Sequence, residues 1–135
     1  MEDLKVESQP RMNVLGKPLT SCSCSPMTGW IRDGYCRASH SDLGDHIICC
    51  VMTKSFLSYS KAQGNNLSTP IPEFNFPGLE PGNHWCLCAS RWKEAYLDGM
   101  APLVCLESTD IKALEIIGLE AVSYTHLTLP TTPYV

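Results

Sequence analysis

The chain has 135 residues, of which 44% are apolar, and this is enough for one domain with a single hydrophobic core. A net charge of −4 and the lack of any Lys/Arg cluster argue against nucleic acid or an anionic membrane surface as a partner. The longest apolar run, 47–52, is too short to span a membrane, and the polar N-terminus lacks the apolar run of a secretory signal, so we expect a cytoplasmic protein.

Eight cysteines are unusual for a chain of this kind. An even number is compatible with a disulfide framework, but small disulfide scaffolds are mostly secreted proteins. Cys49, Cys50 and Cys105 also lie within apolar runs, where free cysteine behaves as a small hydrophobic residue. We therefore expect reduced thiols rather than disulfides.

The first half of the chain predicts one strand and one helix. Residues 1–12 are polar and charged, and we expect a disordered leader there. Turn-forming residues fill 13–34 and include Asp33-Gly34, a hairpin signal. A continuous apolar run then predicts a strand over 46–53 that is buried on both faces. Thr53 is placed to cap a helix over 54–63, whose Phe56 and Leu57 face inward.

The second half begins with an unusual proline-rich stretch. Prolines at 70, 72, 77 and 81 exclude a helix or a central strand, so we expect a long, stiff, ordered loop. Phe74, Phe76 and Leu79 should pack this loop against the body of the protein. A strand over 84–89 follows, and Ser90 is placed to cap the next helix. A short strand over 103–106 and a helix from Ser108 or 109 complete the pattern.

This order of elements predicts an α+β fold. We expect a small mixed sheet of three or more strands, two or three helices and the proline-rich loop, in one globular domain over 13–122. Residues 123–135 carry no charged side chain and are rich in threonine. We expect a disordered tail there, and its composition resembles translated sequencing adaptor, which would make it non-native.

The cysteines suggest a metal site as one hypothesis. Thiolate ligands at strand and loop positions suit zinc or an iron–sulfur cluster. The spacing argues against it, because there is no Cys-x-x-Cys knuckle. The candidate ligands are Cys22, Cys36, Cys86 and Cys88.

A thiol or acid–base enzyme acting on a small molecule is a second hypothesis. Asp42, His46 and Cys49 are the nearest grouping of acid, base and thiol, and they are the candidate catalytic residues. His46 and Cys49 are three residues apart, so on a strand they face opposite sides. Arg32 and Arg91 could hold an anionic substrate, although Arg91 more readily bonds the carbonyl groups of the proline-rich loop. The candidate substrate-binding residues are Arg32, Arg91 and Trp85.

A non-catalytic module for a peptide or another protein is the third hypothesis. The loop over 70–81 and the aromatic residues near it could line a groove. The alternative is that these rings form the core of a small, loop-rich domain. None of the three hypotheses specifies a reaction, so the function stays unknown at this point.

Several short motifs follow one another along the chain. They are Asn13-Val14-Leu15-Gly16, Pro26-Met27-Thr28-Gly29, Arg32-Asp33-Gly34, Asp42-Leu43-Gly44-x-His46-x-x-Cys49, Phe76-Pro77-Gly78-Leu79 and Trp85-Cys86-Leu87-Cys88-Ala89-x-Arg91-Trp92. Together they resemble the domain-of-unknown-function 2237 family over about 13–117. The resemblance implies a small single-domain protein with no assigned activity. Where the family usually has aspartate this chain has Asn66 and Asn83, which puts any acid–base or ligand role of those positions in doubt.

Overall fold

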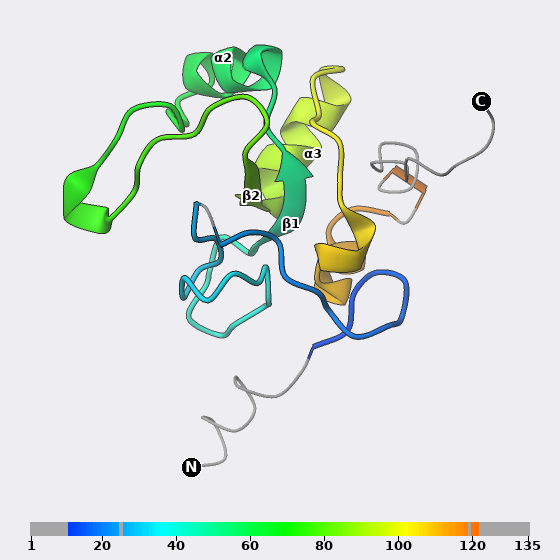
Figure 1. Ribbon diagram of the computed structural model, residues 1–135. Coiled ribbons are helices and arrows are strands. Elements are labelled where there is room, and N and C mark those ends of the chain that lie inside the picture. The colour runs from blue at the N-terminus through cyan, green and yellow to red at the C-terminus, as the bar shows by residue number, and fades with distance from the viewer. Residues whose placement is uncertain (1–10, 25, 119, 122–135) are drawn as a thin grey trace, which may run out of the picture.

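The computed structural model describes residues 11–24, 26–118 and 120–121 (Figure 1). At its centre is a two-stranded antiparallel sheet formed by β1 (His46–Val51) and β2 (His84–Cys88). In its register Cys49 lies opposite Cys86, and Cys50 lies opposite Trp85. The four central residues of β1 are buried, which confirms the prediction of a strand covered on both faces.

Two α-helices follow the two strands. Helix α2 (Lys54–Ala62) begins as predicted, since the Thr53 hydroxyl accepts a hydrogen bond from the backbone N–H of Phe56 at 3.0 Å. Helix α3 (Ala89–Leu97) begins earlier than predicted, because β2 continues into it without a connecting loop. Cys88, not Ser90, therefore occupies the N-cap position, and it makes no side-chain capping bond.

The predicted third strand and third α-helix are wrong. Residues 103–106 contribute one bridge, between Val104 and Cys50, and no strand. Residues 106–115, where the third α-helix is predicted to begin, form the 3₁₀ helices η2 (Leu106–Ser108) and η3 (Ile111–Glu115) instead. Between them Thr109 and Asp110 are extended and bridge to other segments, and this pairing interrupts any continuous helix.

The hairpin signal also forms no hairpin. Asp33 and Gly34 lie in a bend, and no strand flanks them. Over the described residues the fold is thus a small α+β domain with two strands and two α-helices, accompanied by short 3₁₀ helices. The prediction of a mixed sheet with three or more strands is not met.

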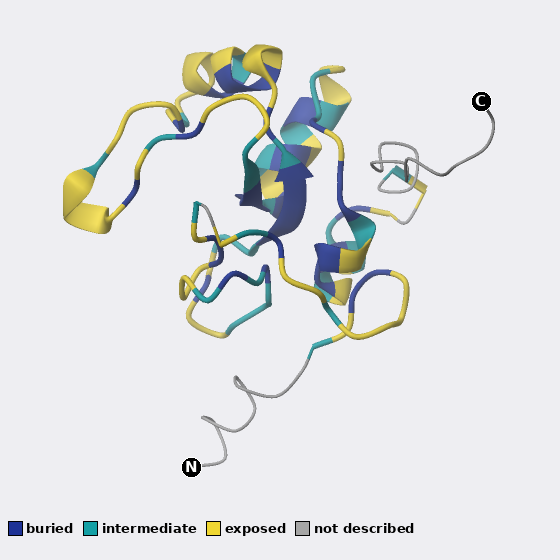
Figure 2. Cartoon of the chain, in the orientation of Figure 1, coloured by how far each residue is buried: buried dark blue, intermediate teal, exposed yellow. Residues whose placement is uncertain are grey.

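The two faces of the sheet are chemically different. One face joins the hydrophobic core, in which Trp85 and Leu87 of β2 pack with Phe56 of α2 and Trp92 of α3. The opposite face carries a separate buried cluster of cysteines, which we call the sulfur cluster. Its members are Cys22, Cys36, Cys49, Cys86 and Cys105. Figure 2 shows that the two strands are largely buried.

The proline-rich segment extends away from the sheet between α2 and β2, with the 3₁₀ helix η1 (Pro72–Phe74) at its far end (Figure 1). Phe76 and Leu79 are buried, but Phe74 is 69% exposed. The expectation that Phe74 packs on the body is therefore wrong. Ile71 and Phe76 bridge to each other across a tight turn, and Phe74 lies at its tip.

Two residues of the predicted leader make contacts with the described part of the chain. Arg11 forms an ion pair with Asp110, and Met12 bridges to Pro18. The rest of the predicted leader, 1–10, and the predicted tail, 123–135, lie outside the described residues. None of the helices in the described part of the chain is long and apolar enough to cross a membrane.

Candidate functional site

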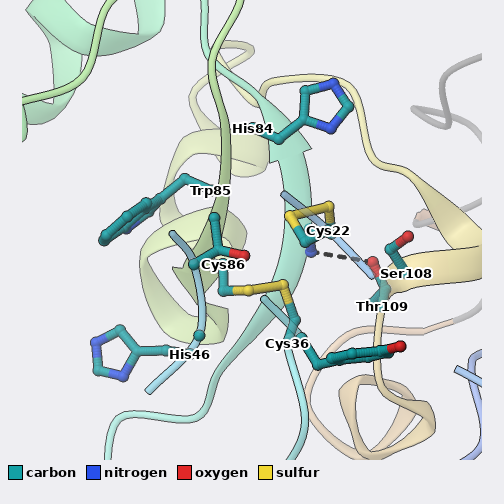
Figure 3. Close-up of a disulfide and its surroundings, with 12 residues drawn as sticks. Cys22, Cys36, His46, His84, Trp85, Cys86, Ser108 and Thr109 are labelled. Atoms are coloured by element: carbon teal, nitrogen blue, oxygen red, sulfur yellow. Dashed lines mark hydrogen bonds between the residues drawn. A yellow bond between two sulfur atoms is a disulfide. The ribbon is translucent and has the colours of Figure 1, made fainter. Parts of the chain in front are cut away.

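Two disulfides tie the loop over 22–36 to the sheet (Figure 3). Cys22 is bonded to Cys49 of β1 and Cys36 to Cys86 of β2, with Cα–Cα distances of 5.9 and 5.2 Å that are ordinary for disulfides. The expectation of reduced thiols is wrong for these four residues. Among the described cysteines, the free ones are Cys24, Cys50, Cys88 and Cys105.

The two disulfides are adjacent within the sulfur cluster. The Sγ atoms of Cys22, Cys36 and Cys49 all lie within 4.8 Å of one another. Three of the four predicted metal ligands, Cys22, Cys36 and Cys86, are therefore in this cluster, together with Cys49. The fourth, Cys88, lies outside it and has its Sγ 3.2 Å from the Ser90 hydroxyl.

One member of the sulfur cluster is a free thiol. Cys105 is buried, and its Sγ lies 4.0 Å from Nδ1 of His84. A ring nitrogen of His84 and the Sγ atoms of Cys105 and Cys49 are all within 4.8 Å of one another. Desolvation by burial, assisted by the charge of Glu107, raises the pKa of the Cys105 thiol to about 11.

A cleft of about 380 Å³ borders the other candidate residues. Its lining comes from residues 29–32, from residues 44–46 at the start of β1, from residues 65–76 and from residues 85–91 of β2 and α3. His46, Arg32, Arg91 and Trp85 all line it, so the structure brings these four predicted site residues together. Apolar walls with a few polar groups are typical of small-molecule sites.

His46 is held in a fixed orientation at one end of this cleft. The Asp42 carboxylate accepts a hydrogen bond from the backbone N–H of His46 at 2.7 Å, and its other oxygen lies 2.6 Å from Nδ1 of the ring. The Asp42 side chain is fully buried, whereas that of His46 is 35% exposed. Trp30 stacks on the imidazole at 5.3 Å between ring centroids, and Gly44 lies directly beside the ring. Asp42 and His46 thus form a pair with the imidazole facing the cleft.

Arg32 and Trp85 form a second feature of the cleft. The guanidinium carbon of Arg32 lies 5.1 Å from the centroid of the Trp85 ring, a cation–π contact. Nη1 of Arg32 also donates to the carbonyl of Gly29 at 2.6 Å. Phe76 packs edge-on against the Trp85 ring, and these two rings form one wall of the cleft.

Arg91 lies at the base of the proline-rich segment. Its Nη1 donates to the carbonyl of Gln63 at 3.1 Å and approaches Glu94 at 3.3 Å. The predicted bond from Arg91 to a carbonyl of the proline-rich loop is replaced by this bond to the end of α2. Since a guanidinium has five N–H donors, further donors remain for a ligand.

The three candidate catalytic residues are not all brought together. Asp42 and His46 meet, but the sulfur of Cys49 is bonded to Cys22 within the sulfur cluster. The free thiol nearest to His46 in the register is Cys88, which is its partner across the strands and lines the same cleft. Only knowledge of the strand register could have identified this pairing from the sequence.

Comparison with known proteins places the chain among uncharacterised sequences. The sequence profile of the family described as "Uncharacterized protein conserved in bacteria (DUF2237)" matches residues 12–126. No curated protein matches the chain.

Proposed function

Since the chain belongs to the DUF2237 family, whose function is unknown, we propose a function from its own cleft: it binds a small anionic molecule with a flat apolar part, and His46 transfers a proton to or from it. The observation that carries this proposal is the buried Asp42 carboxylate bound to an imidazole that lines the cleft. The stacked Trp30 ring supports it by restricting the imidazole further.

The Asp42–His46 pair supports acid–base chemistry at one nitrogen. With Asp42 ionised, Nδ1 of His46 carries the hydrogen and donates it to the carboxylate. Nε2 is then the nitrogen left to accept a proton from a molecule in the cleft. A carboxylate behind a histidine in this way fixes the ring orientation and stabilises the imidazolium that forms.

The arginines and aromatic rings support recognition of an anionic, flat molecule. Arg32 and Arg91 line the cleft, and guanidinium groups bind carboxylates and phosphates with two parallel hydrogen bonds. The exposed area of Trp30 and the wall of Trp85 and Phe76 offer apolar contact for the rest of the molecule.

Titration with benzoate, followed by calorimetry and by NMR, tests the binding step. We expect saturable binding that shifts the signals of His46 and Trp85. Arg32→Gln and Arg91→Gln should each weaken it about tenfold or more, because a hydrogen bond to a charged group contributes about 1.5–3 kcal/mol.

Arg37→Gln is the matched control for this titration. Arg37 pairs with Asp33 and lies over Tyr35, outside the residues that line the cleft, so its removal should leave benzoate binding unchanged. Equal weakening in all three variants would point to a general charge effect.

Binding of extended peptides without any binding of benzoate would favour the alternative of a peptide module built on the loop over 70–81, where Phe74 is exposed.

A zinc site in the sulfur cluster is the second candidate, for the protein with its disulfides reduced. The observation that favours it is the mutual approach, within 4.8 Å, of the Cys22, Cys36 and Cys49 sulfurs, with Cys86 bonded to Cys36. Four thiolates suit a structural zinc, and the predicted cytoplasmic location would favour reduction. Stoichiometric zinc that stays bound to reduced protein through gel filtration would support it, and metal-free reduced protein would exclude it.

A further inference from the structure

Cys105 is a free thiol placed against a disulfide. Its Sγ lies within 4.8 Å of the Sγ of Cys49, which is bonded to Cys22. The backbone holds this approach, because the N–H of Cys105 donates to the carbonyl of Cys49 at 2.8 Å. The ring nitrogen of His84 lies 4.0 Å from the Cys105 sulfur, at the distance of a weak hydrogen bond involving sulfur. Thiol, disulfide and base are thus neighbours.

The contacts continue to the second disulfide. The Sγ of Cys36 lies within 4.8 Å of the sulfurs of both Cys22 and Cys49, and Cys36 is bonded to Cys86. Cys86 lines the cleft that holds His46 and Arg32. A row of neighbouring sulfurs therefore connects Cys105 and His84 with Cys86, one of the residues that line the cleft.

We propose that the sulfur cluster is a thiol–disulfide exchange centre in which Cys105 is the attacking thiol. His84 takes the proton of Cys105, and the resulting thiolate attacks Sγ of Cys49. Because burial raises the pKa of Cys105, only a small fraction of it is thiolate at neutral pH, so this step is slow. The Cys49–Cys105 bond forms while the Cys22–Cys49 bond breaks, and Cys22 leaves as a thiolate. One thiolate is consumed and one is produced, so the step needs no oxidant or reductant.

A second exchange of the same type then forms a thiolate at Cys86, beside the cleft. The Cys22 thiolate attacks Sγ of Cys36, the Cys36–Cys86 bond breaks, and Cys86 leaves as a thiolate beside the cleft. The Cys86 thiolate can then attack a low-molecular-weight disulfide. Cys86 forms a mixed disulfide with one half of that molecule, and the other half leaves as a thiolate.

Alkylation of oxidised protein without any reductant tests the exchange. N-ethylmaleimide is added for increasing times over several hours, since uncatalysed rearrangement takes minutes to hours. Acid quenching and non-reducing peptide mapping then identify the labelled cysteines. We expect the label to appear at Cys22 and Cys86 as well as at the free cysteines. In Cys105→Ser the label at Cys22 and Cys86 should fall at least tenfold.

Cys50→Ser is the matched control, because Cys50 is also a free buried thiol but lies on the opposite face of the sheet. In Cys50→Ser, the label should reach Cys22 and Cys86 to the same extent as in the wild type. Label that never reaches Cys22 in the wild type, or that reaches it equally in Cys105→Ser, overturns the proposal.

A second variant keeps the test decisive if Cys105→Ser does not fold. Cys22→Ser leaves Cys49 free beside Cys105, and oxidation of this variant with glutathione disulfide should yield the Cys49–Cys105 bond. Its absence, with Cys49 joined only to glutathione, contradicts the proposed attack. None of these measurements depends on a ligand in the cleft, so the exchange and the proposed binding function can fail separately.

Discussion

At the scale of single residues, the orientation of His46 depends on the lack of a side chain at Gly44. A Cβ at this position would lie 2.7 Å from Cε1 of the imidazole, closer than such atoms pack. We therefore expect Gly44→Ala to displace the ring from Asp42 and to cost about 1–3 kcal/mol of unfolding free energy. Nitrogen NMR of the imidazole should show one tautomer in the wild type and loss of that preference in the variant.

Gly118→Ala provides the comparison for this prediction. Nothing lies within 4 Å of a Cβ at Gly118, so the His46 signals should remain as in the wild type. An unchanged imidazole spectrum in Gly44→Ala would mean that the contact with Asp42 does not need this space.

At the scale of elements, the two α-helices begin in different ways. Thr53 caps α2 with its hydroxyl, and its replacement by alanine should lower the free energy of unfolding by about 1 kcal/mol. Ser90 lies in the first turn of α3 and is exposed, so Ser90→Ala should change it by less than about 0.5 kcal/mol. Urea denaturation of both variants measures the difference, and an equal loss would indicate that Ser90 stabilises α3 after all.

The elements that could be predicted from the sequence are those specified by local signals. Strand β1 and helix α2 follow from local signals, namely a continuous apolar run and a capping threonine. The segment around Thr109 and Asp110 could not be predicted in this way, because its conformation depends on bridges to Cys36 and Asn13, which are far apart in the sequence.

The candidate site shows the same limit. Asp42 and His46 are close in the sequence, and their residue types alone suggested a pair. The disulfides join residues 27 and 50 positions apart, so they depend on the strand register and on the path of the loop over 22–36. Without that register, the sequence does not show that Cys49 is bonded to Cys22 or that Cys88 lies opposite His46.

At the scale of the whole molecule, Asp110 connects distant parts of the chain. It pairs with Arg11 through two hydrogen bonds and accepts another from the backbone N–H of Ala38. Burial alone would raise the pKa of its carboxyl group, but the hydrogen bonds from Arg11 and from the backbone N–H groups of Lys112 and Ala38 outweigh this and lower it. The ionised form is therefore the one that stabilises the fold.

This pKa shift predicts a pH dependence. Because the pKa of Asp110 is lower in the folded than in the unfolded state, its contribution is complete above about pH 4 and is lost as the pH falls through the folded value. Asp110→Asn should cost about 2–3 kcal/mol at pH 7 and reduce the loss of stability on acidification. Urea denaturation between pH 2 and 7 measures this, with Glu73→Gln, at an exposed position, as the control. An identical acid profile in Asp110→Asn would contradict the prediction.

The two disulfides also determine how freely Trp30 and Arg32 can move. Both residues lie between Cys22 and Cys36, and the partners of these cysteines, Cys49 and Cys86, face each other in the sheet. The segment is thus anchored covalently at both ends to one point of a rigid scaffold. A ligand bound in the cleft as proposed would therefore cost this segment little conformational entropy. If the proposed binding is correct, reduction should weaken it by releasing this segment, even with every contact to the ligand preserved.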